Sequence, residues 1–353
     1  MNRFDYVRPA SLAEALAATQ APGSAYLAGG TNLMDLMKIG VARPERLIDI
    51  SRLPGLSAIE WLADGGVRIG ASVRNSDLAY DERFARAFPA VAEALLSGAS
   101  AQLRNAATVG GNLLQRTRCP YFQDTASACN RRAPGSGCDA IGGENRLHAV
   151  LGWSEHCIAV HASDFCVPLV ALDAVVEIAG PNGVREMPLE ALHPLPGDHP
   201  ELETALAPGE LIVAVRLPAE AAAVRDNARY LKVRERTSYA FAVVSAAAGL
   251  EIEGGLIRRA RIALGGVAAR PWRARYAEAL LEGGTATPEA FTAAADLALA
   301  GAKPSGENAF KIVLARRLVA RALRAALDGT PATMPALPGS VFSTSTKGGE
   351  HAA

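Results

Sequence analysis

The spacing of hydrophobic and polar residues predicts a chain that mixes short strands with short helices. Near the N-terminus, residues 25–28 and 47–50 are apolar runs of strand length, and residues 33–37 between them have a helical pattern. Ser11 begins another apolar face of helical period, and Glu14 follows at the position expected in a capping box. The pattern therefore predicts a small β-α-β unit at the start of the chain.

A hairpin, a helical region and a long irregular segment are predicted next. Two short apolar runs flank the turn residues 64–66, which is typical of a β-hairpin. Residues 75–101 have a helical pattern that Pro89 is expected to break. The segment 104–164 contains prolines and glycines at many positions, and these residues exclude a long helix or strand there.

The second half of the chain predicts a further sheet with its own helices. A helix and three strands are expected before a composition shift at residues 219–227, which marks a domain boundary. Beyond it the pattern predicts three antiparallel strands, three helices and an extended or disordered tail rich in Pro, Gly, Ser and Thr. The helices and strands are expected at 167–172, 174–179, 184–187, 211–217, 229–234, 243–252, 256–264, 274–282, 288–300 and 308–327.

The composition favours a protein without a membrane span or a nucleic-acid partner. Half of the 353 residues are hydrophobic, and acidic and basic side chains balance to a net charge of zero. This balance provides no electrostatic attraction to nucleic acid or to an acidic membrane. The longest apolar runs, 166–179 and 240–250, are interrupted or too short to cross a bilayer. The N-terminus has no apolar signal-peptide core, so a cytoplasmic protein is the default expectation.

Four of the five cysteines lie in the irregular segment, at Cys119, Cys129, Cys138 and Cys157. The gaps between them, of nine, eight and eighteen residues, match neither a bacterial ferredoxin nor a zinc finger. Clustering and an odd total argue against a secreted disulfide framework and favour metal or redox chemistry. The residues alone leave an iron–sulfur cluster, a zinc site and a set of buried thiols open. Cys166 lies outside the set and is expected to be a core thiol.

Two glycine-containing segments, 29–32 and 108–112, have a similar layout. Each offers consecutive backbone N–H groups without Cβ crowding, together with a hydroxyl and an amide side chain. Such turns can bind a pyrophosphate. Neither segment matches a Rossmann fingerprint or a Walker loop, and each is weak evidence when taken alone.

Together with their flanking residues, these segments resemble a known family. The runs 27–33 and 104–113 are similar to the two FAD loops in the FAD-binding subunits of molybdenum hydroxylases. That family includes xanthine dehydrogenase, aldehyde oxidoreductase and carbon monoxide dehydrogenase. Ser163 and Asp164 resemble its serine–aspartate pair beside the flavin, and the run 230–234 resembles its strand that places a lysine near the isoalloxazine.

The resemblance implies an α+β fold. Its first part would be a two-subdomain FAD-binding fold of the vanillyl-alcohol-oxidase (PCMH) type, and its second part a C-terminal α+β domain of the carbon monoxide dehydrogenase flavoprotein type. The implied divisions are 1–54 and 55–222 for the FAD-binding subdomains, with an Fe–S insertion at about 115–160, then 227–330 for the C-terminal domain and 331–353 for the tail.

The resemblance also implies an FAD site. Lys232 would place positive charge near the flavin and stabilise its anionic reduced form, and no other catalytic role is assigned. Asp164 would accept hydrogen bonds from ribityl or ribose hydroxyls. Without the resemblance, Lys232 would be a surface lysine on a strand and Asp164 a helix N-cap. The implied FAD-binding residues are Ala28, Gly29, Gly30, Thr31, Asn32, Leu33, Thr108, Gly110, Gly111, Asn112, Ser163, Asp164 and Lys232.

The cysteine segment resembles an insertion in the flavin subunit of bacterial periplasmic-type aldehyde oxidoreductases, where it holds a [4Fe–4S] cluster. The ligands implied by this resemblance are Cys119, Cys129, Cys138 and Cys157. The arginines expected to offset the negative charge of the cluster are Arg116, Arg118, Arg131 and Arg132. The nearby histidines are interpreted as hydrogen-bonding partners and not as ligands, at His148, His156 and His161.

The function implied by the resemblance is electron transfer within a heterotrimeric molybdenum-dependent aldehyde oxidoreductase. A molybdopterin-binding large subunit would oxidise the substrate, a small [2Fe–2S] subunit would pass electrons to FAD in this chain, and an external acceptor would take them. Co-export with a partner that carries a twin-arginine signal would place the complex in the periplasm. Two alternatives stay open: a stand-alone flavin oxidase, and a non-enzymatic assembly subunit stapled by zinc.

Overall fold

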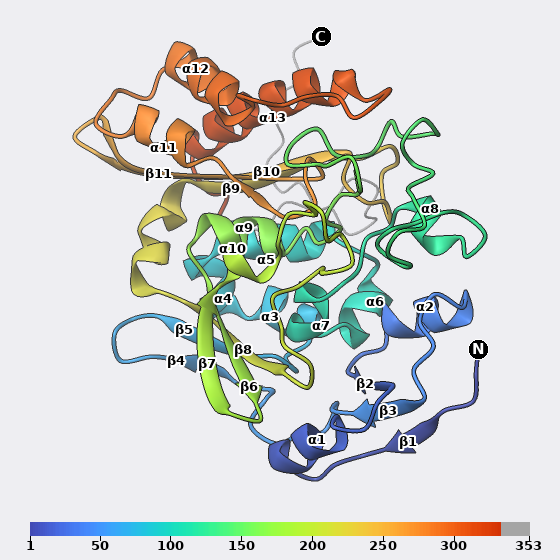
Figure 1. Ribbon diagram of the computed structural model, residues 1–353. Helices are drawn as coiled ribbons and strands as arrows, with labels where there is room; N and C mark the ends of the chain where they lie inside the picture. Colours follow the sequence, from blue (N-terminus) through green and yellow to red (C-terminus); the bar gives the residue numbers. More distant parts are fainter. Residues whose placement is uncertain (333–353) are drawn as a thin grey trace.

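Three β-sheets, each with helices beside it, follow one another from the N-terminus to the C-terminal part of the chain (Figure 1). The computed structural model describes residues 1–332, so nearly all of the tail predicted at 331–353 lies outside the described residues. No helix within the described range is both long and apolar enough to cross a bilayer. The mixture of helices and sheets confirms the predicted α+β class.

The first sheet contains the β-α-β unit predicted from the sequence. Its strands run parallel in the order β1-β3-β2. Ser11 caps the first helix by accepting a hydrogen bond from the Glu14 amide (3.2 Å), and the Glu14 carboxylate accepts one from the Ala10 amide (2.8 Å). The elements are β1 (Asp5–Val7), α1 (Leu12–Ala18), β2 (Ser24–Leu27), α2 (Leu33–Lys38) and β3 (Arg46–Asp49).

The second sheet is antiparallel and has the strand order β4-β5-β8-β6-β7. Pairing of its first two strands confirms the predicted hairpin at 64–66. Phe84, Val91 and Val167 from the helices share one buried core with Ile69 of the sheet. The elements are β4 (Ile59–Trp61), β5 (Val67–Gly70), α3 (Asn75–Tyr80), α4 (Glu82–Ala87), α5 (Pro89–Ser97), α9 (Cys166–Ala171), β6 (Val175–Gly180), β7 (Gly183–Pro188), α10 (Leu189–Leu192) and β8 (Leu211–Leu217).

The helical region predicted at 75–101 is broken twice, and the sequence predicted one break. Asp81 ends α3 and caps α4, because its Oδ1 accepts a hydrogen bond from the Phe84 amide (2.7 Å). Pro89 then starts α5 as its first residue, which is the helical position where the missing N–H of proline costs least. The predicted break at Pro89 is confirmed. The break at Asp81 was not predicted, because Asp81 acts as a cap and not as a helix residue.

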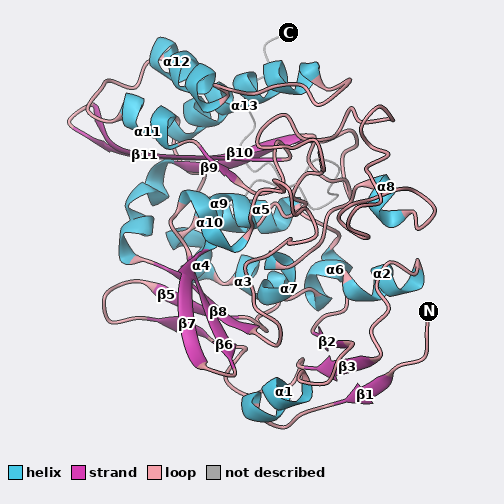
Figure 2. Ribbon diagram, in the orientation of Figure 1, coloured by secondary structure: helices cyan, strands magenta, loops and turns pink. Residues whose placement is uncertain are grey.

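The irregular segment contains short helices and long loops, as Figure 2 shows to the right of the molecule, between α2 below and α13 above. Its helices are α7 (Val109–Leu113) and α8 (Pro120–Gln123), and α6 (Ala101–Ala106) precedes them. The glycine turn expected at 108–112 is instead the start of α7, with Thr108 as its N-cap. Gly110 is needed there because a Cβ on it would lie 2.9 Å from the Ala71 Cβ.

The third sheet is antiparallel, with the order β12-β11-β10-β9. Helices α11, α12 and α13 cover one face, while α5 and α9 of the preceding part pack against the other face (Figure 1). The sequence missed α10, β12 and the 3₁₀ helix η1, all of which are short or irregular. The elements are η1 (Ala219–Asn227), β9 (Ala228–Val233), β10 (Val244–Glu253), β11 (Leu256–Gly265), β12 (Trp272–Arg273), α11 (Arg275–Leu281), α12 (Pro288–Ala298) and α13 (Ala309–Leu327).

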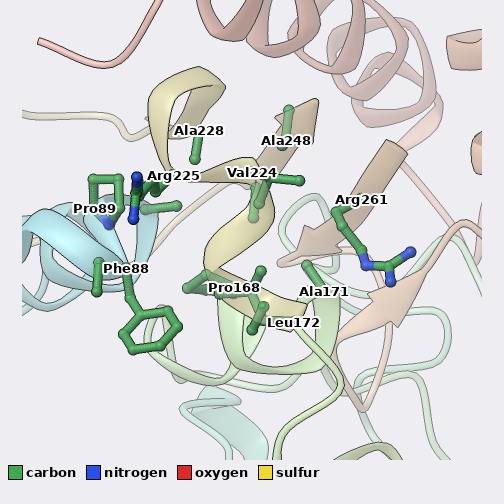
Figure 3. A pocket seen from close by; sticks show the side chains of 15 residues that line it. Phe88, Pro89, Pro168, Ala171, Leu172, Val224, Arg225, Ala228, Ala248 and Arg261 are labelled. Atoms are coloured by element: carbon green, nitrogen blue, oxygen red, sulfur yellow. The ribbon is translucent and has the colours of Figure 1, made fainter. Parts of the chain in front are cut away.

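A small recess marks the seam where α5, α9 and η1 meet β10 (Figure 3). Its lining is mostly apolar and includes Phe88, Pro168 and Val224. Its volume of about 10 Å³ is close to that of a single water probe. The recess is therefore a packing seam between the second and third sheets and too small for a cofactor.

Candidate functional site

A cavity of about 620 Å³ lies where the three parts of the molecule meet. This volume is in the usual range for cofactor and ligand sites. Its lining includes six of the residues predicted from the sequence, namely Thr31, Asn32, Gly111, Asn112, Asp164 and Lys232. Cys119 of the cysteine set also lines it, as do residues 239–243 of the loop between β9 and β10. Segments distant in the sequence therefore form one site.

The first glycine loop presents a row of free backbone donors. It connects β2 to α2, and Gly30 adopts a left-handed conformation (φ +72°) that glycine reaches without strain. The N–H groups of residues 29–33 have no hydrogen-bond acceptor within residues 1–332. Successive unpaired N–H groups of this kind form a concave anion site. The loop is thus suited to a phosphate group.

The second glycine segment differs, because its backbone donors are already engaged. The N–H groups of Val109 and Gly110 donate to the carbonyls of Val73 (2.9 Å) and Ala71 (2.8 Å). The Gly111 amide donates to the hydroxyl of its helix cap (3.3 Å), and the Asn112 amide donates within the helix. The row of free donors expected from the sequence is therefore not found in this segment.

The Asn112 side chain connects the second glycine segment to the serine–aspartate pair. Its carboxamide oxygen accepts hydrogen bonds from the Ser163 hydroxyl (2.7 Å) and from Gln115 Nε2 (2.6 Å). Ser163 in turn accepts a hydrogen bond from the Cys166 amide (3.2 Å) at the start of α9. Ser163 therefore contacts the first amide of the helix, whereas the Asp164 carboxylate is turned to other partners.

Gly29 allows the two glycine segments to lie against each other. A Cβ on Gly29 would lie 2.0 Å from the carbonyl oxygen of Ala106, closer than any real contact. The Asn32 carboxamide oxygen also accepts a hydrogen bond from the Arg116 amide (3.0 Å). These contacts join the first sheet to the segment that leads into the cysteines.

Asp164 and Lys232 form a buried ion pair in the cavity wall. Asp164 accepts hydrogen bonds from Lys232 Nζ (2.8 Å) and from the Tyr230 hydroxyl (2.6 Å). Lys232 Nζ also donates to the Ser97 carbonyl (3.1 Å). Burial and the neighbouring Asp164 charge raise the pKa of Tyr230 well above its usual value, so this hydroxyl remains a donor. The sequence missed Tyr230, although it lies two residues before Lys232 on the same face of β9.

Polar atoms without partners line the cavity and show that it suits a polar ligand. Within the described chain, five buried side-chain atoms in its wall have no hydrogen-bond partner: Asn32 Nδ2, Asn75 Oδ1, Arg104 Nε, Arg118 Nε and His148 Nδ1. Buried polar groups are normally paired because an unmade hydrogen bond costs free energy. A large ligand with phosphate, hydroxyl and ring-nitrogen groups can supply such partners.

The four predicted cysteine ligands are free thiols gathered in one region. None of the five cysteines in the described chain forms a disulfide. Cys129 and Cys138 pair across a short antiparallel bridge. Burial, with a smaller contribution from neighbouring Cys129 and Cys157, raises the pKa of Cys119 to about 11. Burial and these same two neighbours raise the pKa of Cys138.

The cysteines do not converge on a single point. Among residues 1–332, no group of three or more His, Cys, Asp or Glu side chains has the geometry of a metal-ion site. A single zinc ion requires ligands about 2.0–2.3 Å from one centre. The observed arrangement therefore does not match a closed mononuclear zinc site.

Of the four arginines expected around the cysteines, one contacts a sulfur atom. Arg131 Nη2 lies 3.6 Å from Cys157 Sγ, and the same side chain pairs with Glu203 (3.2 Å). Arg116 also pairs with Glu203, and Arg132 donates to backbone carbonyls. Arg118 lies over the Phe241 ring, 5.1 Å from its centroid. Of the arginines predicted to offset the charge of a cluster, Arg131 is therefore the one placed to do so.

His148 contacts a cysteine, which agrees with its predicted role as a hydrogen-bonding partner, whereas Lys311, which holds the His148 backbone, was missed. His148 Nε2 lies 3.2 Å from Cys119 Sγ. Burial and the nearby Lys311 charge lower the pKa of His148 to about 4. Lys311 of α13 is fully buried and donates to the carbonyls of Leu147 (2.8 Å), His148 (2.8 Å) and Gly266 (2.6 Å). No sequence signal connects Lys311 to this segment, because the contact crosses between domains.

Known proteins resemble this chain over nearly its whole length. Residues 2–220 match the family described as FAD binding domain in molybdopterin dehydrogenase, and residues 229–326 match the CO dehydrogenase flavoprotein C-terminal domain. The chain is 51% identical to the aldehyde oxidoreductase FAD-binding subunit PaoB of Escherichia coli (strain K12), over 92% of this chain and 98% of that protein.

Carbon monoxide dehydrogenase provides a second relative and a matching structure. The chain is 30% identical to the carbon monoxide dehydrogenase medium chain of Hydrogenophaga pseudoflava, over 92% of this chain and 97% of that protein. The solved carbon monoxide dehydrogenase from the same organism superposes with a TM-score of 0.72 at 31% identity, covering 93% of this chain and 98% of that one. The chain therefore belongs to the FAD-binding medium subunits of the molybdenum hydroxylase family and is an oxidoreductase subunit.

Proposed function

We propose that this chain is the electron-transfer subunit of a heterotrimeric molybdenum-dependent aldehyde oxidoreductase. The observation that carries the proposal is the cavity, which joins the free donors of loop 29–33 and the Asp164–Lys232 pair to Cys119. FAD bound there would accept electrons and release them to an acceptor. The chain's own task is to bind the cofactor, shield it and set its electrostatic surroundings.

The binding roles proposed for the residues follow from their positions. Loop 29–33 would hold the phosphates through its free N–H groups, and the Lys232 ammonium would place positive charge in the wall near the flavin. Asp164 would hold Lys232 in place and would also accept hydrogen bonds from cofactor hydroxyls. The residues proposed to contact FAD are Ala28, Gly29, Gly30, Thr31, Asn32, Leu33, Thr108, Gly110, Gly111, Asn112, Ser163, Asp164 and Lys232.

The cysteine set is proposed to hold a [4Fe–4S] cluster. The four thiols are free, and Cys129 and Cys157 lie close enough to Cys119 and Cys138 to raise the pKa of both. Four cysteine thiolates are the usual ligands of such a cluster. Arg131 would offset part of its negative charge. Cys119 contributes to both sites, so the proposed cluster would lie beside the flavin and relay electrons. The ligands are Cys119, Cys129, Cys138 and Cys157.

The proposal extends to the rest of the complex. Relatives are named as medium chains or FAD-binding subunits, which supports a large molybdopterin-binding partner, a small [2Fe–2S] partner and an external electron acceptor. We place the domain divisions at 1–54, 55–222 and 227–330, in line with the three sheets. The proposed compartment is the cytoplasm, with the periplasm as the result of co-export with a signal-bearing partner.

Two matched cysteine variants test the metal site. Cys129→Ser is expected to lose iron and acid-labile sulfide while it keeps FAD, because Cys129 is in the proposed set and lies outside the cavity wall. Cys166→Ser is the control, since Cys166 is also a buried free thiol but lies on α9 outside the set. Equal iron in both variants, or zinc in place of iron in the wild type, would overturn the cluster.

Reduction kinetics test the relay and the alternatives. In the complete complex, Cys129→Ser should leave the reduction of FAD by an aldehyde intact and slow the transfer to an artificial acceptor. If a folded variant without the cluster transfers electrons to the acceptor at the normal rate, the cluster has a structural role and is not a relay. Reduction of FAD by an aldehyde in the isolated chain would favour a stand-alone flavin oxidase.

A further inference from the structure

His148 lies between the flavin cavity and the cysteine set. Its side chain lines the cavity, and its Nε2 is 3.2 Å from Cys119 Sγ. Cys119 also lines the cavity, whereas Cys129, Cys138 and Cys157 do not. The imidazole therefore contacts the sulfur atom that is nearest to the proposed flavin position along the wall.

The surroundings of the imidazole determine which nitrogen carries the proton. A cysteine sulfur that ligates a metal is a thiolate, which carries no proton and can only accept a hydrogen bond. In the 3.2 Å contact with Cys119 Sγ, His148 Nε2 must therefore carry the proton and donate it. His148 Nδ1 is buried without a partner within the described residues and is available to a ligand in the cavity.

The backbone of His148 is held from the C-terminal domain. Its carbonyl oxygen accepts hydrogen bonds from Lys311 Nζ (2.8 Å) and from Asn308 Nδ2 (3.1 Å). Both donors are fully buried at the start of α13. Lys311 Nζ donates to three carbonyl oxygens, and no carboxylate pairs with it in the described chain. Burial lowers the pKa of Lys311 to about 7. These contacts hold the backbone from which the imidazole projects.

We propose that His148 is a positioning residue that donates an N–H···S hydrogen bond to the Cys119 thiolate and thereby raises the reduction potential of the group bound by the cysteines. Hydrogen bonds to ligating sulfur atoms stabilise the reduced, more negative state of an iron–sulfur centre. This inference rests on the proposed [4Fe–4S] cluster. It assigns to His148 a role in setting the direction of electron flow between the flavin and the cluster.

The test compares two substitutions in the complete complex by EPR-monitored redox titration. His148→Phe keeps a ring but removes the donor, and the one-electron midpoint potential of the cluster should shift to a more negative value. His148→Gln restores an amide donor and should return the potential toward that of the wild type. His156→Phe is the control in the same segment, because its imidazole is half exposed and faces Asp198 (3.6 Å). Its potential should not change.

A second readout is spectroscopic and does not depend on the midpoint potential. Isotope-labelled histidine in the wild-type protein should give a nitrogen coupling in the pulsed EPR spectrum of the reduced cluster, and His148→Gln should remove it. A wild type without iron or sulfide would refute the cluster itself. A wild type with the full cluster, but with no nitrogen coupling or with the same potential in His148→Phe, would refute the role of His148 alone.

Discussion

The Lys232 ammonium and the Asp164 carboxylate depend on each other, since both side chains are at least nine-tenths buried. Removing one partner leaves an uncompensated buried charge, which typically costs about 3–5 kcal/mol. Lys232→Met should therefore lower the free energy of unfolding by about that amount and reduce the FAD-to-protein ratio. Chemical denaturation and visible absorbance measure the two effects. The exposed Lys303 offers a control, and Lys303→Met should change stability by less than about 0.5 kcal/mol.

A second residue, His193, predicts how stability changes with pH. It is buried and donates Nε2–H to the Leu113 carbonyl (2.8 Å), and burial lowers its pKa to about 4. In the unfolded chain the pKa is about 6.5, so between these values only the unfolded state binds the proton. Stability contributed by the neutral imidazole is thus present above about pH 6.5 and is lost as the pH falls toward about 4.

A variant isolates the contribution of His193. His193→Asn retains an N–H donor for the Leu113 carbonyl but does not titrate, so its unfolding free energy should fall less steeply between pH 7 and pH 5. Between pH 7 and pH 5, the unfolding free energy of the wild type should fall by about 2 kcal/mol more than that of the variant. Urea denaturation midpoints at both pH values measure this. Identical slopes for the wild type and the variant would contradict the assignment.

At the scale of elements, the loop before α2 and the segment before α7 must touch for the cavity to form. Gly29→Ala would place a Cβ 2.0 Å from the Ala106 carbonyl oxygen, so the two segments would have to separate. We expect loss of bound FAD and a melting temperature lower by several degrees. Gly284→Ala is the control, because its Cβ would meet no atom closer than 3.4 Å and its φ is not left-handed. Equal flavin content in both variants would contradict the close approach.

Local hydrophobic patterns predict some helices and strands well and fail for others. Periodicity located three of the four strands of the C-terminal sheet, and the long helix α13, to within a few residues, because each buries one continuous apolar face. It failed for α7, where Gly110 and Gly111 indicated a turn. Thr108 caps that short helix, and contact with Ala71 explains the glycine. These two glycines therefore indicate close packing against a neighbouring segment and not a free loop.

Across the whole molecule, Arg273 connects the FAD-binding part to the C-terminal domain. Its side chain is almost fully buried, pairs with Glu278 of α11, and donates to the Val170 carbonyl (2.5 Å) and to Asp173 (3.1 Å). Arg273→Met should destabilise the protein by about 3–5 kcal/mol, because Glu278 would keep its buried charge without a partner. Unfolding monitored by calorimetry should also become less cooperative between the two parts.

A double variant separates lost charge pairing from lost packing. Arg273→Met combined with Glu278→Leu removes both charges, and it should recover part of the stability lost in Arg273→Met, since a buried ion pair can often be replaced by apolar residues. A double variant no more stable than the single variant would show that the contacts to Val170 and Asp173 dominate.

The sequence by itself determined the α+β class, the first β-α-β unit, the hairpin, the antiparallel C-terminal strands and the family, because these depend on local periodicity and on short motifs. It also identified the cysteine set by simple clustering. Only the tertiary structure decided which backbone donors are free: those of residues 29–33 are, and those of residues 109–112 are not. It likewise placed His148 against Cys119 and Lys311 beneath His148. These contacts join residues far apart in the chain, and no local pattern encodes which distant groups will satisfy a buried donor or charge.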